Sequence, residues 1–210
     1  MDLVLYHYVH CPYCVRVRMA LGYLQLSYQS RVIDYDDEKT PTDLVGVKML
    51  PILVHKGVPL RESLDIIKRI DRKNTLKNDL PISSAETFIK SANNLIHSLT
   101  MPQWIYTKEF TPSAREYFIK QKETKRGPFK QLVAKSDDFI RELNPHFAEL
   151  EKRLKPFFES DEITIQDIMI AAHLWGLYVV PEFQFPAKIH QYLQKIKSLT
   201  RFNYHQDYWS

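Results

Sequence analysis

Cysteine, glycine and long apolar runs are scarce in this 210-residue sequence. Its two cysteines are too few for the disulfide framework that holds small secreted domains together. Five glycines against twelve prolines indicate long helices with short connections rather than an all-β fold. The longest apolar stretch, which begins at Ile168, is shorter than the roughly 20 residues of a membrane-spanning helix. We therefore expect a buried core helix there and no membrane partner.

A concentration of charge of one sign is also missing. The sequence holds 29 basic and 25 acidic residues, a net charge of +4, and both signs are spread along the chain. Because a nucleic-acid-binding surface concentrates basic residues, nucleic acid is not an expected partner. The N-terminus has neither a basic leader nor an unbroken apolar segment, which is unlike a secretory signal peptide. We expect a soluble protein of the reducing cytoplasm.

The first 75 residues alternate between strand and helix patterns. Runs rich in β-branched and aromatic residues predict strands over 3–8, 28–34, 51–55 and 58–62. Apolar residues at helical spacing predict helices over 12–26 and 63–73, the second with Ser63 as its N-cap, and the polar segment 36–46 predicts a loop with a short helix. These elements predict a small mixed sheet with helices packed on it.

Beyond this first unit the patterns are helical. Asn, Asp, Pro and Ser interrupt the periodicity around residues 75–83, as an inter-domain linker would. Helices are predicted over 84–100, 112–125, 128–155, 164–180 and 186–198. The expected organisation is an α/β domain over 1–74, a linker over 75–83 and an all-helical domain over 84–210.

Both cysteines lie in one short motif, Cys11-Pro12-Tyr13-Cys14. Cys11 follows the first strand at the start of a helix, where unpaired backbone N–H groups and the helix dipole stabilise a thiolate. Such positions lower a cysteine pKa from about 8.5 to roughly 3.5–7.5, and Arg16 adds positive charge nearby. Cys14, one turn along, is placed to close a disulfide with Cys11. The motif predicts a nucleophile, Cys11, with a resolving partner, Cys14.

A structural zinc site is the alternative use of a Cys-x-x-Cys pair. It needs two further ligands, and the sequence has no second pair. His7 and His10 are nearby, but His10 directly precedes Cys11, which is a poor geometry for a closed tetrahedral site. The redox interpretation is therefore favoured over zinc, and His7 is interpreted as a packed strand histidine.

Three segments of the first domain, HCPYC, TPTDLVGVKMLPIL and RESLDII, together resemble the larger, two-domain bacterial glutaredoxins of the glutaredoxin 2 type. The segment TPSAREYFIKQKE resembles the second domain of that type, so the resemblance covers the whole chain. It implies a thioredoxin-like N-terminal domain with a mixed sheet and an all-α C-terminal domain, in a glutathione-transferase-like architecture.

The resemblance also implies a glutathione-binding groove. It places a cis proline at Pro51, facing Cys11, with the backbone of Leu50 against the cysteinyl part of glutathione. It assigns Glu62 and Ser63 to the γ-glutamyl group, although Ser63 as a helix N-cap would also explain its presence. Two further residues complete the predicted groove: Tyr13 against the tripeptide, and Arg16, which offsets the charge of a glutathione carboxylate or of the thiolate. A solvated helix arginine is the alternative for Arg16.

The predicted function is that of a glutathione-dependent dithiol oxidoreductase acting on protein disulfides and protein–glutathione mixed disulfides. Glutathione is the expected co-substrate, with no metal or flavin. One alternative is a glutathione transferase that conjugates electrophiles, which would leave Cys14 unexplained. Another is a non-catalytic binding module or iron–sulfur scaffold, which the resemblance disfavours because glutaredoxins with Pro12 in this motif do not generally assemble a cluster.

Several other features are predicted to be structural. Thr164 to Asp167 read as a capping box before an apolar helix. Trp104, Trp175 and the aromatic tail 201–209 are interpreted as core and domain-interface packing, with a hydrophobic substrate pocket as the alternative. His173, on an apolar helix face, is interpreted as a core histidine rather than a ligand.

Overall fold

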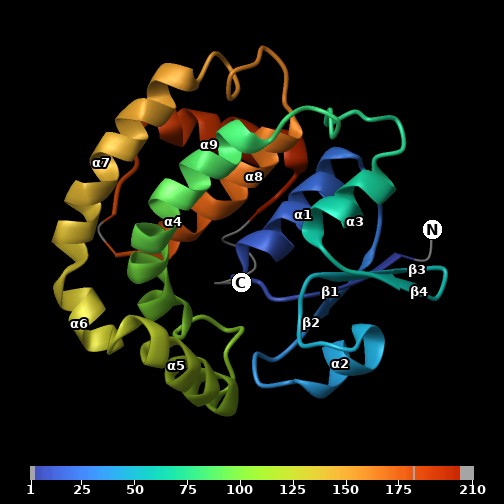
Figure 1. Ribbon diagram of the computed structural model, residues 1–210, viewed down its shortest axis with the longest axis horizontal. Helices are drawn as coiled ribbons and strands as arrows, with labels where there is room; N and C mark the ends of the chain where they lie inside the picture. The colour runs from blue at the N-terminus through green and yellow to red at the C-terminus, as the bar shows by residue number, and fades with distance from the viewer. Residues whose placement is uncertain (1–2, 182, 204–210) are drawn as a thin grey trace.

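A computed structural model describes residues 3–181 and 183–203 of the chain (Figure 1). The N-terminal domain contains a four-stranded sheet in the order β2-β1-β3-β4. Its strands are β1 (Leu3–His7), β2 (Gln29–Val32), β3 (Ile52–His55) and β4 (Val58–Leu60). β1 is parallel to β2 and antiparallel to β3, and β3 is antiparallel to β4. The predicted mixed sheet is therefore confirmed.

Three helices belong to this domain: α1 (Pro12–Tyr23), α2 (Lys39–Val45) and α3 (Ser63–Ile70). α1 connects the parallel strands β1 and β2, which need such a crossover. It ends three residues earlier than predicted, and Gln25, just beyond it, has a positive φ of 53° that no α-helix continues through.

The rest of the described chain is helical. It comprises α4 (Ser83–Trp104), α5 (Pro112–Arg126), α6 (Phe129–Ala134), α7 (Ser136–Arg153), α8 (Ile165–Leu174), the 3₁₀ helix η1 (Trp175–Val179) and α9 (Ala187–Thr200). In Figure 1 the long helices α4 and α7 run beside α8 and α9. The predicted all-helical second domain is confirmed.

Two helices predicted for the second domain are each divided in the structure. The single helix expected over 128–155 is two helices, because the backbone at Lys135 leaves helical geometry, with φ −106° and ψ 12°. Asp137 and Asp138 then lie in the first turn of α7, where their charges suit a helix N-terminus. The helix expected over 164–180 is α-helical only to Leu174 and tightens into η1.

The two domains share one continuous apolar core, with α1 packed against α3 on one side and against α8 and α9 on the other. All ten residues of α8 are buried, as its apolar sequence predicts. Trp104 and Trp175 are core residues, which confirms their interpretation, and Phe202 is buried with its ring centre 5.9 Å from that of Trp175. The remainder of the aromatic tail, 204–209, lies outside the described residues. Within the described part of the chain no helix has the length and apolarity to cross a membrane.

Candidate active site

Cys11 is the N-cap residue of α1, and Pro12 occupies the first helical position. The carbonyl of Cys11 accepts the first helical hydrogen bond, from the N–H of Val15 at 2.9 Å. A proline costs no hydrogen bond there, because N–H groups of the first turn have no intrahelical partner. The thiol of Cys11 is half-buried and that of Cys14, in the first turn, is fully buried, and both are free.

The two thiols have opposite ionisation behaviour. The pKa of Cys11 is lowered, chiefly because the Cys14 side chain hydrogen-bonds to it, and also by the charge of His10 and by backbone N–H groups of the first helical turn. Burial raises the pKa of Cys14 well above its usual value, and its bond to Cys11 adds to this. The backbone N–H of Tyr8 points at the Cys14 sulfur from 3.4 Å. The arrangement supplies one thiolate and one thiol that keeps its proton.

A second group of predicted residues lies beside these thiols. Leu50 belongs to a small buried cluster with Tyr8, Cys14, Ile33 and Ile52, and Cys11 packs against it. The Leu50–Pro51 peptide bond is cis, as the resemblance implies, and Pro51 is buried. The structure therefore brings Leu50 and Pro51 next to the motif, although about forty residues separate them in sequence.

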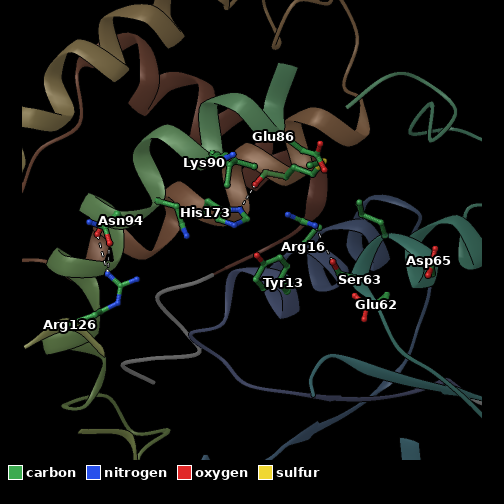
Figure 2. Close-up of a pocket in the computed structure, with 14 residues that line it drawn as sticks. Tyr13, Arg16, Glu62, Ser63, Asp65, Glu86, Lys90, Asn94, Arg126 and His173 are labelled. Atoms are coloured by element: carbon green, nitrogen blue, oxygen red, sulfur yellow. Dashed lines mark hydrogen bonds between the residues drawn. The ribbon is translucent and has the colours of Figure 1, made fainter. Parts of the chain in front are cut away.

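The remaining four predicted residues, Tyr13, Arg16, Glu62 and Ser63, line one pocket of about 800 Å³. Figure 2 shows them on one wall of this pocket, contributed by α1 and the start of α3. The Arg16 side chain donates from Nη1 to Ser63 Oγ at 3.1 Å, and its guanidinium lies 5.0 Å from the centre of the Tyr13 ring.

Two interpretations of these residues are corrected by the structure. Arg16 is not solvated but only 4% exposed. Ser63 is not the N-cap of α3; that residue is Glu62, with a positive φ of 66°, and Ser63 is the first helical residue. The Ser63 hydroxyl instead accepts the Arg16 hydrogen bond. Tyr13 is 48% exposed.

The opposite wall of the pocket comes from the helical domain and was missed by sequence reasoning. Glu86, Lys90 and Asn94 project from successive turns of α4 (Figure 2). Because they are four residues apart, they form a polar stripe along one face of the helix. This pattern in the sequence could have indicated that this face of the helix lines a pocket. Arg126, at the end of α5, donates to Asn94 Oδ1 at 3.0 Å. No local signal marks Arg126, because only the fold brings the end of α5 within reach of Asn94 and His97 of α4.

His173 completes this wall. Its Nδ1 lies 2.8 Å from the Met169 carbonyl, and burial together with the charge of Arg16 lowers its pKa to about 3. It is the packed core histidine that the sequence predicts, and its ring also meets the Tyr13 ring edge-on at 5.5 Å.

The histidines near the motif have partners other than a metal. His7 Nε2 lies 2.8 Å from Ser30 Oγ, and the side chain is buried, which confirms its interpretation as a packed strand histidine. His10 Nδ1 lies 2.8 Å from Glu109 Oε2. Over residues 3–181 and 183–203, no group of three or more His, Cys, Asp and Glu side chains is arranged to hold a metal ion.

Comparisons with known proteins match both domains. The family model described as "Glutaredoxin 2, C terminal domain" matches residues 84–208, and the model "Glutathione S-transferase, N-terminal domain" matches residues 5–77. The chain is 31% identical over 206 residues to glutaredoxin 2 of Escherichia coli strain K12, which covers 95% of this chain and 96% of that protein.

Solved structures agree with these matches. Glutaredoxin 2 from Salmonella typhimurium, crystallised in complex with glutathione, is 30% identical and superposes with a TM-score of 0.89, covering 98% of this chain and 97% of that one. A glutathione transferase from Phanerochaete chrysosporium has a TM-score of 0.81 at 16% identity, over 97% of this chain and 98% of that one, which shows the shared fold. Because the similarity extends over both domains and nearly the full length of these relatives, the chain belongs to the glutaredoxin 2 family.

Proposed function

We propose that this protein is a glutathione-dependent dithiol oxidoreductase that reduces protein disulfides and protein–glutathione mixed disulfides. The observation that carries the proposal is the pair of thiols at the start of α1, one with a lowered and one with a raised pKa, beside a polar pocket. Membership of the glutaredoxin 2 family supports the same chemistry, and the Salmonella relative was crystallised with glutathione.

The first step is nucleophilic attack by Cys11. Its thiolate forms a bond to one sulfur of the substrate disulfide, and the other sulfur leaves as a thiolate that takes up a proton. A thiolate at the N-cap of α1 needs no general base, because the helix dipole and the Cys14 hydrogen bond already stabilise it. The product is a mixed disulfide on Cys11.

Two routes resolve this mixed disulfide. When glutathione is attached to Cys11, a second glutathione thiolate attacks its sulfur, releases oxidised glutathione and restores the Cys11 thiolate. When a protein is attached, Cys14 loses its proton, attacks the Cys11 sulfur and expels the protein thiol. Two glutathione molecules then reduce the Cys11–Cys14 disulfide, so that two electrons pass to each substrate disulfide.

The pocket beside the thiols supports a role in seating glutathione, which carries two carboxylates and one ammonium group. Arg16 and the N-terminal end of α3 suit a carboxylate, since helix N-termini bind anions. Glu62 and Glu86 suit the ammonium group. Leu50 offers backbone polar groups to the cysteinyl part, and the exposed Tyr13 ring can lie against the tripeptide.

Substitution of each cysteine tests the proposal. Cys14→Ser should keep substantial deglutathionylation, because free glutathione can resolve the intermediate, while losing most reduction of protein disulfides. Cys11→Ser should lose both activities. Initial rates with a glutathionylated protein and with a disulfide-bonded protein provide the measurement, and circular dichroism confirms folding of each variant.

Other outcomes would contradict this mechanism. Equal loss of both activities in two folded variants would remove the one-thiol route. Retention of protein-disulfide reduction in Cys11→Ser would assign the nucleophile to Cys14. Conjugation of electrophiles with little disulfide exchange in the unmodified protein would instead indicate a transferase.

A further inference from the structure

One buried carboxylate of the helical domain reaches the segment just before Cys11. Glu109 lies between α4 and α5, and its side chain is 1% exposed. Its Oε1 accepts the backbone N–H of Val9 at 2.7 Å, and its Oε2 accepts that of His10 at 3.0 Å. The same Oε2 lies 2.8 Å from His10 Nδ1. One side chain therefore holds two consecutive backbone N–H groups and one ring, about a hundred residues away in sequence.

The His10 ring is enclosed by aromatic side chains as well. Its centroid lies 5.0–5.8 Å from those of five rings, two from the N-terminal domain and three from the helical domain: Tyr8, Tyr35, Trp104, Phe110 and Phe118. The ring is therefore held by the Glu109 carboxylate and by an aromatic cage, and both depend on the helical domain.

We propose that Glu109 is a positioning residue for the thiol chemistry: it fixes the Val9–His10 backbone and the His10 ring, and through them the orientation and charge environment of Cys11. The helical domain would then act on the nucleophile of the N-terminal domain without touching the substrate. This inference rests on the proposed function of Cys11 as the nucleophile.

Other charged and titratable groups around Cys11 also influence its ionisation. Cys14 and Arg16 face it from α1, Lys122 from α5, and the tyrosine hydroxyls of Tyr8 and Tyr35 from the strand ends. The Glu109 charge raises the pKa of Tyr8 and of Cys14, so its removal lowers both. A positive charge on His10 lowers the pKa of Cys11, whereas the negative charge of Glu109, acting alone, would raise it. The two effects of removing Glu109 therefore have opposite signs.

The test is the rate of Cys11 alkylation by iodoacetamide as a function of pH. Glu109→Gln keeps the size of the side chain, but its amide NH₂ cannot accept one of the bonds that the carboxylate accepts. If Glu109 acts by positioning, the pH of half-maximal alkylation should rise by about half a unit to one unit, which is roughly a three- to tenfold lower rate at a pH well below the half-maximal point. Glu116→Gln, an exposed Glu of α5, is the matched control and should leave the profile unchanged.

A second variant keeps the test decisive if Glu109→Gln fails to fold. His10→Phe preserves an aromatic ring in the cage while removing the charge, and it should move the half-maximal pH in the same direction. In the double variant the two shifts should not add, because both act through one contact. Kinetics of glutathione-dependent reduction should show a loss at pH 6 that diminishes towards pH 9, where Cys11 ionises in every variant.

Three results would contradict the proposal, and they distinguish a failure of the Glu109 role from a failure of the proposed nucleophile. An unchanged or lower half-maximal pH in Glu109→Gln, with only its melting temperature reduced, would overturn the positioning role. An unchanged profile in His10→Phe would do the same. If the unmodified protein shows no thiol that ionises below the ordinary cysteine range of about 8.5, the proposed nucleophile itself is wrong.

Discussion

At the scale of single residues, the pocket is defined by a buried arginine. Burial lowers the pKa of Arg16 to about 10, which still leaves it charged at neutral pH. Ser63 accepts one of its donors, while its Nε has no protein partner among the described residues. A buried charge with an unused donor is costly unless an anion can approach it. Arg16 and Ser63 thus form a polar unit suited to a ligand carboxylate.

The double substitution Glu62→Gln with Ser63→Ala should raise the KM for glutathione. Loss of a charged contact and of a hydroxyl partner should cost about 1.5–3 kcal/mol of binding, roughly a ten- to hundredfold increase in KM. Alkylation of Cys11 in the absence of glutathione should change much less. The paired control, Ser113→Ala with Glu116→Gln, makes the same chemical changes at exposed positions of α5. Unchanged glutathione kinetics in the first variant would remove Glu62 and Ser63 from the binding site.

At the scale of secondary structure, the start of α8 is held by a capping box. Thr164 and Asp167 form the predicted capping box, in which the Asp167 carboxylate accepts the Thr164 N–H at 2.8 Å. The same carboxylate accepts the Phe158 N–H at 2.8 Å and the Tyr192 hydroxyl at 3.0 Å. The cap therefore also ties the preceding loop and α9 to α8, which the sequence pattern does not show.

Substitutions of the two capping residues should lower the free energy of unfolding by different amounts. Thr164→Ala removes one capping bond and should lower the free energy of unfolding by about 1 kcal/mol. Asp167→Ala leaves several buried donors unpaired and should cost more, about 3–5 kcal/mol. Urea denaturation measures both, and Thr124→Ala, at an exposed position of α5, serves as the control. Equal costs for Thr164→Ala and Asp167→Ala would show that Asp167 acts only as a local cap.

At the scale of the whole molecule, α1 carries the reactive motif at one end and a close domain contact at the other. A Cβ atom placed on Gly22 would lie 1.8 Å from the backbone oxygen of Thr200 at the end of α9. The helical domain therefore approaches α1 at both ends, through Glu109 near Cys11 and through Thr200 near Gly22. This double contact fixes how the pocket walls face each other.

Gly22→Ala should be destabilising, although alanine is the better helix former by about 1 kcal/mol. The added methyl group meets backbone rather than a flexible side chain, so we expect a loss of about 3 kcal/mol or more in the free energy of unfolding. Gly176→Ala is the matched comparison, because its Cβ would lie 3.2 Å from a Trp104 side-chain atom, a much milder overlap than the 1.8 Å at Gly22. A Gly22→Ala variant as stable as the unmodified protein would mean that α9 moves away from α1 at little cost.

Much of the secondary structure could be predicted from the sequence, because its signals are local. Strand alternation, the Cys11–Cys14 spacing and the Thr164–Asp167 box each act within a few residues, where backbone geometry decides the outcome. The boundaries were less predictable. The break at Lys135 and the N-cap at Glu62 arise where local propensities are weak and packing selects the conformation.

By itself the sequence determined the order of elements, the two-domain architecture and the position of the reactive dithiol at a helix start. Only the tertiary structure decided that Arg16 is buried on Ser63, that α4 forms the second wall of the pocket and that Glu109 holds His10 beside Cys11. The physical reason is sequence distance. These contacts join residues between 47 and about 100 positions apart, and no periodicity or spacing within one segment records which distant segment will pack against it.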